Sequence, residues 1–344
     1  MLLPEWATPS TILLAWPTSD TDWNERLADT QGLYIELISH LIRYQDVVLL
    51  IQPQHYDNTQ RYLTSRIKDN LHRLTRVAMP YNDTWLRDSG PLSVIQNNAL
   101  SWLDFQFNGW GQKHAFDQDT QITRRLMELD WVQTQVQHRP IEVVLEGGSV
   151  ETNGQHLLLT TTSCVLNKNR AANRTREELN GLFNTWFGTE HTLWLEHGHI
   201  LGDDTDGHID TLARFCDSNH IVFQACDEPS YPAFSTLRNM AQELKAYANT
   251  HQLTLTPLPW PSPCYDAATQ TQRLPATYAN FLIGQQQIIV PQYQVPEDVK
   301  ALEVLAGVFP QHQVIGLNCR PLIEQGGSLH CITMQLPQLR IPTP

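Results

Sequence analysis

Basic residues are in the minority in this chain. Its 23 Lys and Arg stand against 36 Asp and Glu, for a formal net charge of −13. DNA and RNA are bound by basic surfaces that neutralise phosphates, so this balance argues against a nucleic-acid partner. A negative cleft concentrates cations, so a cationic substrate is compatible with it, although acidic surfaces also serve solubility.

Long apolar runs and export features are missing as well. No window approaches the roughly 18 uninterrupted apolar residues that predict a transmembrane helix, so we expect no membrane span. Met1–Trp6 has neither a basic start nor an apolar stretch, which predicts a cytoplasmic protein. No CxxC spacing occurs, so the cysteines are expected to be reduced thiols. The six are Cys164, Cys216, Cys226, Cys264, Cys319 and Cys331.

Linker sequences are absent too. No Gly/Ser-rich stretch or run of one charge divides the 344 residues, and the 21 prolines are scattered. Length alone would suit about two domains. Without a linker, we expect residues 1–344 to form a single catalytic domain.

Apolar patterns predict alternating strands and helices. Thr11–Trp16 and the continuous apolar run Val47–Ile51 are typical of strands. Between them, apolar residues at helical spacing predict a helix over Thr30–Arg43, and a second helix is expected over Gln60–Leu74. This alternation indicates an α/β fold.

A hairpin pattern recurs along the middle of the chain. Four times an apolar segment reaches a turn and returns, at about residues 98, 154, 218 and 284, with helical stretches between several turns. Near-constant spacing of one unit predicts a ring, closed where Gly326–Gln335 forms a strand beside the N-terminal piece. The predicted hairpins are 91–95 with 99–107, 149–152 with 156–160, 211–215 with 221–224, and 278–283 with 287–291. The predicted helices between them are 121–131, 174–186 and 235–251.

Polar clusters lie at the edges of these hairpins. In a ring, equivalent edges converge on the axis, so clusters distant in sequence are expected to share one pocket, where catalytic groups usually lie. The clusters are Asn82–Pro91, Leu145–Ser149, Gly202–Asp210 and Glu324–Thr333.

One cysteine, Cys331, follows a Gly-Gly pair and is expected to open a short apolar strand. A nearby cation or helix dipole would lower the pKa of its thiol and make it a nucleophile. A small buried apolar residue is the alternative.

His208 and Asp210 alternate around Ile209, and in a strand they would share one face and point at one substrate. Histidine transfers protons near neutral pH. The alternatives are a solvated acidic turn, or a divalent-cation site built with Asp203, Asp204 and Asp206.

Asp88 lies three residues after Trp85, and Glu146 precedes another Gly-Gly pair. A carboxylate beside an aromatic face suits a planar cation, whereas Glu146 orients other groups or caps the turn. An Arg87–Asp88 pair on the surface is the alternative. One thiol, one imidazole and several carboxylates together favour a guanidinium, which two acids clamp for attack by a thiolate.

These motifs make the chain recognisable. It resembles the agmatine deiminase and bacterial peptidylarginine deiminase family of the guanidino-group-modifying superfamily, over nearly its whole length. The motifs carrying the resemblance are Pro4–Trp6, Leu14–Pro17, Asn82–Pro91, Leu145–Ser149, Asn167–Arg170, Asp203–Asp210, Tyr278–Phe281 and Gly326–Cys331.

The resemblance implies a five-fold pseudosymmetric α/β propeller and a cysteine mechanism without metal or cofactor. Cys331 matches the nucleophile, His208 the general acid/base, and Asp88 and Asp210 the carboxylates that hold the guanidinium. It further implies that Asn280 is an active-site residue and that Trp85 lines the pocket.

The resemblance also implies a small cationic guanidino substrate, and agmatine, yielding N-carbamoylputrescine and ammonia on the route to putrescine, is expected. Asp204 stands where some members carry a Glu that contacts the distal amine. Peptidylarginine or another guanidino compound is the alternative substrate, and a metal hydrolase and a non-catalytic propeller are alternatives of other kinds. A homo-oligomer is left open, since closed oligomers are common.

Overall fold

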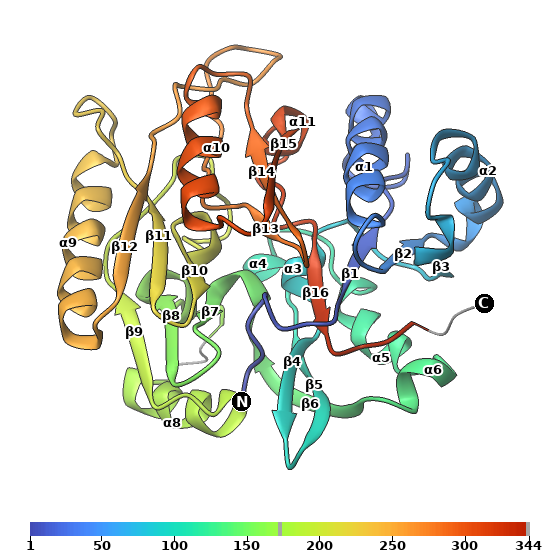
Figure 1. The fold of residues 1–344 in the computed structure, drawn as a ribbon, viewed down its shortest axis with the longest axis horizontal. Coiled ribbons are helices and arrows are strands. Elements are labelled where there is room, and N and C mark those ends of the chain that lie inside the picture. Colours follow the sequence, from blue (N-terminus) through green and yellow to red (C-terminus); the bar gives the residue numbers. More distant parts are fainter. Residues whose placement is uncertain (171–173, 342–344) are drawn as a thin grey trace.

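A computed structural model describes residues 1–170 and 174–341 of the chain. The predicted domain, 1–344, therefore includes six residues, 171–173 and 342–344, that lie outside the described part. Within the described part, sixteen strands form five separate sheets, and helices lie mostly toward the outside (Figure 1). The predicted α/β class is confirmed.

Four of the sheets share one plan. The first two strands form an antiparallel hairpin, and the third strand joins the second in parallel after a helical connection. All four predicted hairpins are present, although the first arm of the fourth, predicted over 278–283, covers only Leu282–Ile283. The sheets are β4 (Leu92–Gln96), β5 (Ala99–Gln106) and β6 (Gln137–Val144); β7 (Val150–Thr152), β8 (Leu157–Thr161) and β9 (His191–Leu195); β10 (Ala213–Asp217), β11 (His220–Gln224) and β12 (Thr254–Leu258); and β13 (Leu282–Ile283), β14 (Gln287–Gln292) and β15 (Gln313–Asn318).

The fifth sheet joins the two ends of the described chain. Its order is β16, β1, β2, β3, with β16 antiparallel to β1 and the other pairs parallel. It thus repeats the hairpin-plus-parallel-strand plan with one additional strand, and its β16–β1 pair joins a C-terminal strand to the N-terminal piece, as predicted. Its strands are β1 (Ser10–Ala15), β2 (Val47–Ile51), β3 (Leu74–Ala78) and β16 (Met334–Pro337).

A helix connects the second and third strand of each unit. Three of these were predicted nearly at their bounds, while 121–131 is broken into two short helices. The connecting helices are α1 (Leu27–Leu41), α5 (Ile122–Leu126) with α6 (Asp130–Gln133), α8 (Arg176–Phe187), α9 (Phe234–His251) and α10 (Glu297–Val308). The remaining helices are α2 (Tyr56–Arg66), α3 (Leu86–Ser89), α4 (Gly109–Gln112), α7 (Thr162–Val165) and α11 (Arg320–Ile323). Short 3-10 helices are η1 (Asn24–Arg26), η2 (Pro53–His55), η3 (Leu71–Arg73), η4 (Asp119–Gln121), η5 (Gly147–Ser149) and η6 (Ile209–Thr211).

Local chemistry explains why α8 lies where it does. Thr175 caps its first turn by accepting from the backbone N–H of Glu178, whose side chain accepts from Thr175 N in return. Gly188 ends the helix in the left-handed region, at φ 69°, where glycine carries no Cβ penalty. Apolar residues on one face then bury against the neighbouring strand.

Two predicted elements were wrong. The helix expected over 60–74 ends at Arg66, and Leu74 begins β3, because the half-buried LTRVA segment pairs in parallel with β2 instead. The strand expected over 326–335 begins only at Met334, and the segment before it forms turns. Both errors arise because sheet pairing, rather than local apolar pattern, decides the element.

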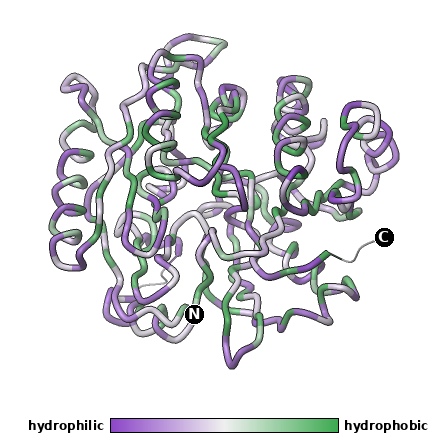
Figure 2. Tube along the Cα trace, viewed as in Figure 1, coloured by the Kyte–Doolittle hydropathy of each residue, from purple (hydrophilic) through white to green (hydrophobic). Residues whose placement is uncertain are grey.

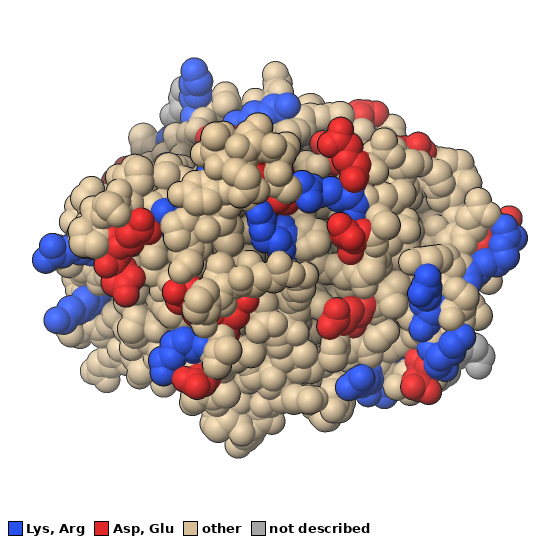
Figure 3. All heavy atoms as spheres, turned by 90° about the horizontal axis from the view of Figure 1, so that it is seen from above, with Lys and Arg blue, Asp and Glu red and all other residues tan. Residues whose placement is uncertain are grey.

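Hydrophobic residues line the strands, whereas hydrophilic ones gather along the peripheral helices such as α2 and α9 (Figure 2). Three apolar clusters form the core between sheets and helices. None of the described helices combines the length and apolar character needed to cross a bilayer. On the face drawn in Figure 3, the described acidic and basic side chains are interspersed, without the continuous basic patch that nucleic acids require.

Candidate active site

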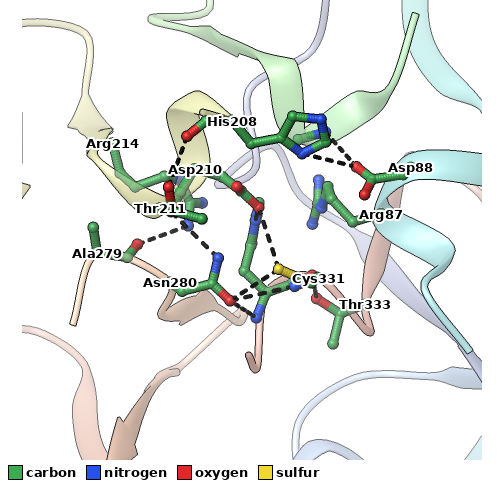
Figure 4. A network of polar contacts seen from close by, with 12 residues as sticks. Arg87, Asp88, His208, Asp210, Thr211, Arg214, Ala279, Asn280, Cys331 and Thr333 are labelled. Carbon is green, nitrogen blue, oxygen red and sulfur yellow. Dashed lines mark hydrogen bonds and ion pairs between the residues drawn. The ribbon is translucent and has the colours of Figure 1, made fainter. Parts of the chain in front are cut away.

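Cys331 lies in the turn that precedes β16, so the expectation that it opens a strand was wrong. Its side chain is buried, and its Sγ lies 3.4 Å from Asn280 Oδ1 and 3.9 Å from Asp210 Oδ2 (Figure 4). The backbone N–H of Arg87 donates to the Cys331 carbonyl at 3.1 Å, which anchors the turn beside α3. Cysteine, amide and carboxylate thus come from three distant segments.

His208 and Asp210 also reach this point, but not from a strand. His208 precedes the 3-10 helix η6, and Asp210 lies within it. The shared-face argument for a strand was therefore wrong, although Figure 4 shows Asp210 at Cys331 and His208 beside Asp88 in the same group of residues. His208 and Asp210 are both buried; Asp210 Oδ1 has no hydrogen-bond partner in the described part of the chain, whereas His208 pairs with Asp88.

Asp88 lies on α3 on the other side of the site. Its Oδ1 accepts from Gly148 N at 3.0 Å and lies 3.5 Å from His208 Nδ1. Its Oδ2 accepts from the indole N–H of Trp110 at 2.9 Å. Arg87 is buried and pairs with Glu5, so the alternative of a surface Arg87–Asp88 pair is wrong.

Gly148 fits between the two sides of the site. A Cβ at this position would lie 2.6 Å from His208 Nδ1, 2.8 Å from Asp88 Oδ1 and 3.2 Å from Asp210 Oδ2. Only glycine therefore permits the imidazole and both carboxylates to approach one another. The second Gly-Gly pair acts similarly, because Gly327 lies against the ring of Trp85.

Glu146 is buried on the far side of His208 and pairs with Arg170, whose Nε lies 2.8 Å from both carboxylate oxygens. The donor atoms of Glu146, Cys164 and His208 lie within 4.8 Å of one another, as metal ligands would. Arg170 already supplies the positive charge there, which disfavours a cation.

The acidic run proposed as a cation site does not converge. Asp203 accepts from Thr205 and from the backbone N–H of Gly207, which shapes the turn. Asp206 pairs with Arg170 and Lys113, and Asp210 lies in the buried site instead. Lys113 bridges Asp204 and Asp206, and among the described residues the four carboxylates do not come together as metal ligands would, so the alternative cation site built from this run is wrong.

Asp204 is more exposed than the other site residues. Its carboxylate pairs with Lys113 at 3.1 Å and with His114 at 3.0 Å, on the loop that also carries Trp110. Its role as an amine contact stays a prediction. Asn280 is fully buried, accepts at Oδ1 from the backbone N–H of His330 at 2.9 Å, and donates to the carbonyl of Asp210 at 3.3 Å.

A cavity of about 450 Å³ opens onto Cys331, within the usual size range of small-molecule sites. Trp85 and Trp110 line it, and among its described lining residues there is neither Lys nor Arg. Six aspartates, called here the cavity aspartates, line it: Asp20, Asp22, Asp83, Asp88, Asp119 and Asp204.

Burial and neighbouring charges set the protonation of the site. Burial, together with Asp210 and Asp88, raises the pKa of Cys331 well above its usual value. Burial also raises the pKa of Asp88 to about 6. Burial opposes protonation of His208, but Asp88, Cys164 and Glu146 together outweigh it and raise the pKa of the imidazole well above its usual value. These directions favour a neutral thiol and a protonated histidine.

The same effects act further out in the cavity. Burial raises the pKa of Asp83 to about 7, and the charge of Asp22 adds to the effect. Burial likewise raises the pKa of Asp119 to about 7. A cation between these carboxylates would favour their charged forms.

Sequence reasoning missed several residues of the site. Trp110 stands in a Gly-rich turn with no motif of its own, and its contact with Asp88 spans 22 positions. His330 adjoins Cys331, and Glu5 belongs to the opening Pro4–Trp6 motif, so position within a recognised motif was the available signal.

The family described as Porphyromonas-type peptidyl-arginine deiminase matches residues 1–337. A solved agmatine deiminase from C. jejuni with substrate bound is 33% identical over 98% of this chain and 97% of that chain, with a TM-score of 0.90. A solved structure from Porphyromonas gingivalis is described as that of a proposed arginine deiminase. It is 40% identical over 98% of both chains, with a TM-score of 0.90. An agmatine deiminase from Stutzerimonas stutzeri is 28% identical over 97% of this chain and 94% of that protein.

Proposed function

The chain belongs to the Porphyromonas-type peptidyl-arginine deiminase family, and from this membership we propose that it is an enzyme that hydrolyses agmatine to N-carbamoylputrescine and ammonia. One observation carries the chemistry. Asp210 Oδ1 is buried beside Cys331 without a partner among the described residues, and Cys331 lines a cavity together with six aspartates. Buried polar atoms normally have partners, so this oxygen is the one left to accept a guanidinium N–H.

In the first step, the guanidinium lies between Asp88 and Asp210, which accept its N–H groups. Its positive charge offsets the two carboxylates that hold the thiol protonated, so Cys331 loses its proton to solvent and attacks the guanidinium carbon. Protonated His208 donates its proton to one terminal nitrogen. The C–N bond breaks, ammonia leaves, and an S-alkylthiouronium remains on the cysteine.

In the second step, His208 is neutral and takes a proton from water. The hydroxide adds to the same carbon, and the C–S bond then breaks. The electron pair returns to the Cys331 sulfur, and the hydroxyl proton passes to that sulfur as the C=O bond forms, so the neutral thiol is restored. The product is the ureido compound. One imidazole thus acts first as acid and then as base, and its raised pKa suits the first of these roles.

Charge in the cavity favours agmatine over free arginine. The two substrates differ by the α-carboxylate of arginine, which the cavity aspartates would repel without a described Lys or Arg in the lining to hold it. The distal ammonium of agmatine gains from the same aspartates. A peptidylarginine has a neutral backbone at this position, so charge alone disfavours it less.

The residue roles follow from this proposal. Cys331 is the nucleophile, His208 the acid and base, and Asp88 and Asp210 the guanidinium ligands. Trp85 and Trp110 form walls, Asn280 accepts at the thiol, and Glu146 with Arg170 supports His208. The proposed chemistry uses no metal and no cofactor.

We also infer the wider setting. Five sheets on one plan, with β16 pairing with β1, support a five-fold pseudosymmetric α/β propeller formed by one catalytic domain. The product indicates a cytoplasmic role in putrescine biosynthesis, and a homo-oligomer remains compatible with the fold.

A side-by-side assay tests the substrate. Purified protein is given agmatine, arginine and an arginine peptide, and ammonia release is measured with and without a chelator and a thiol-alkylating reagent. We expect agmatine to be preferred, the chelator to be harmless and alkylation to inactivate. Ammonia from the peptide but not from agmatine contradicts the substrate, and inactivation by the chelator contradicts the cysteine mechanism.

A further inference from the structure

The opening residues of the chain lead into the centre of the molecule. The backbone N–H of Leu2 donates to Phe187 O at 2.7 Å, and that of Leu3 donates to Ser93 O at 2.9 Å. Pro4 then packs on Gly154, and a Cβ added to Gly154 would lie 2.5 Å from the Pro4 ring. Glu5 follows directly. Its side chain is only 14% exposed and lies behind the catalytic residues, on the side away from the cavity.

Glu5 joins a set of buried charged residues, called here the rear network. Its Oε1 lies 3.0 Å from Arg87 Nη1, and its Oε2 lies 2.5 Å from Arg214 Nη2. Arg214 is fully buried in β10 and also pairs with Glu151. The rear network consists of Glu5, Arg87, Glu151, Arg214 and His330.

His330 connects this network to the active site. Its Nε2 lies 2.5 Å from Glu5 Oε1, and its Nδ1 lies 2.7 Å from Asp210 Oδ2. The ring is 2% exposed. A neutral imidazole carries one N–H, so both contacts are hydrogen bonds only if the ring is protonated or one of the carboxyl groups holds the proton.

Charge balance favours one further proton within this buried group. Glu5, Glu151 and Asp210 are three acids, whereas Arg87 and Arg214 are two permanent cations. One further proton makes the buried group neutral, as charges without water require. Burial raises the pKa of Glu151 to about 7, whereas burial, Arg214 and Arg87 lower the pKa of His330.

The contact with His330 leaves the two carboxylate oxygens of Asp210 in different surroundings. Oδ2 is held by His330 and faces Cys331 Sγ at 3.9 Å, while Oδ1 has no partner among the described residues. The free oxygen is the one left to accept a guanidinium N–H. Burial raises the pKa of Asp210, but the hydrogen bond from His330, together with the charges of His330, His208 and Arg214, outweighs it and lowers the pKa, so the carboxyl stays ionised.

We propose that His330, backed by Glu5, is a positioning residue that fixes the rotamer of Asp210 and keeps it charged for the substrate. This inference rests on the proposed guanidino hydrolysis. It assigns a purpose to the Pro4–Trp6 motif, because Glu5 supplies the second acceptor that orients the ring.

Two substitutions of similar polarity separate positioning from packing. In His330→Asn the side-chain amide replaces Nδ1, which faces Asp210, whereas in His330→Gln it replaces Nε2, which faces Glu5. We expect His330→Gln to raise KM for agmatine between about 10- and 100-fold, as loss of a hydrogen bond to a charged group does. His330→Asn should retain more of the affinity, because it still donates to Asp210.

The pH profile gives a second readout. Asp210 faces His330, His208, Arg214, Cys331 and Asp88. Without the His330 donor, burial dominates and the pKa of Asp210 rises, so the acidic limb of kcat/KM should move to higher pH in His330→Gln. Glu5→Gln keeps an acceptor but removes the charge, and it should move the limb in the same direction by less.

The outcomes are distinct. Unaltered protein that releases no ammonia from agmatine, arginine or an arginine peptide overturns the proposed function itself. Active unaltered protein with equal losses in His330→Asn and His330→Gln, or with acidic limbs unmoved, overturns the positioning role. If both His330 variants fail to fold, an acidic limb of Glu5→Gln that coincides with that of the unaltered protein overturns it as well.

Discussion

Carboxylates lie both behind and in front of Cys331, yet the two regions differ. Behind it, the acids of the rear network are matched by Arg87, Arg214 and His330. In front, Asp83 and Asp119 face a cavity without a described Lys or Arg in its lining. Paired acids fix geometry, whereas unpaired acids with raised pKa values gain from an arriving cation. The same residue type therefore builds the scaffold in one region and binds ligand in the other.

The largest effect is expected at Cys331, where the two regions meet. Cys331→Ala removes the nucleophile and should reduce ammonia release by roughly 10⁴-fold or more. A single small side chain is lost, so the circular dichroism spectrum and thermal unfolding should change little. Near-normal turnover in this variant would falsify the covalent mechanism.

His208→Ala removes the proton donor and acceptor of both steps. We expect kcat for agmatine to fall by about 10² to 10⁴-fold, the usual cost of losing an acid/base group. Mass spectrometry of enzyme quenched during turnover shows whether the covalent intermediate on Cys331 forms, and therefore which of the two steps is blocked. If ammonia release stays fast, a different group must protonate the leaving nitrogen.

Gly148→Ala tests the close approach of the two sides. The new methyl group would lie 2.6 Å from His208 Nδ1, so His208 and Asp88 must move apart. Misplacement of this size should reduce kcat/KM by about 10²-fold. Gly181→Ala in α8 is the matched control, since nothing lies within 4 Å of its added Cβ, and activity there should be unchanged.

Asp83 is one of the acids in front of Cys331 that we expect to attract the cationic substrate. Asp83→Asn removes a charge facing the cavity and should raise KM for agmatine about tenfold while kcat changes less. Since the pKa of Asp83 is raised to about 7, its carboxyl is charged only above that pH. In the unaltered protein, KM should therefore rise as pH falls through 7. The rise should be weaker in Asp83→Asn, and an identical pH dependence in both proteins contradicts the assignment.

The smallest effect is expected at Asp204. Lys113 and His114 already pair with its carboxylate near the surface, so Asp204→Asn should raise KM by less than about fivefold. Steady-state KM values of Asp83→Asn and Asp204→Asn show which of the two aspartates binds the distal amine. A larger increase for Asp204→Asn than for Asp83→Asn supports Asp204 as the amine contact, as its motif position predicts.

Sequence patterns predicted the repeated hairpins well, because the apolar segments and turn residues that form them are local. They failed at Leu74–Ala78, where pairing with β2 decides the structure, and at Ile209–Thr211, where a 3-10 helix brings His208 and Asp210 together. Motifs also indicated Cys331 and Asp88. Contacts such as Trp110 with Asp88 lie beyond local pattern, because they depend on how separate units meet.

The pairing of β16 with β1 and of Glu5 with His330 bears on how the protein is made. A ribosome releases β1 long before β16, so the first sheet must wait with an open edge until Met334–Pro337 emerges. Exposed edges of this kind invite pairing with other chains. Nascent chains stalled before Met334 should therefore rely on chaperones, and they should gain resistance to protease only when the last strand is released.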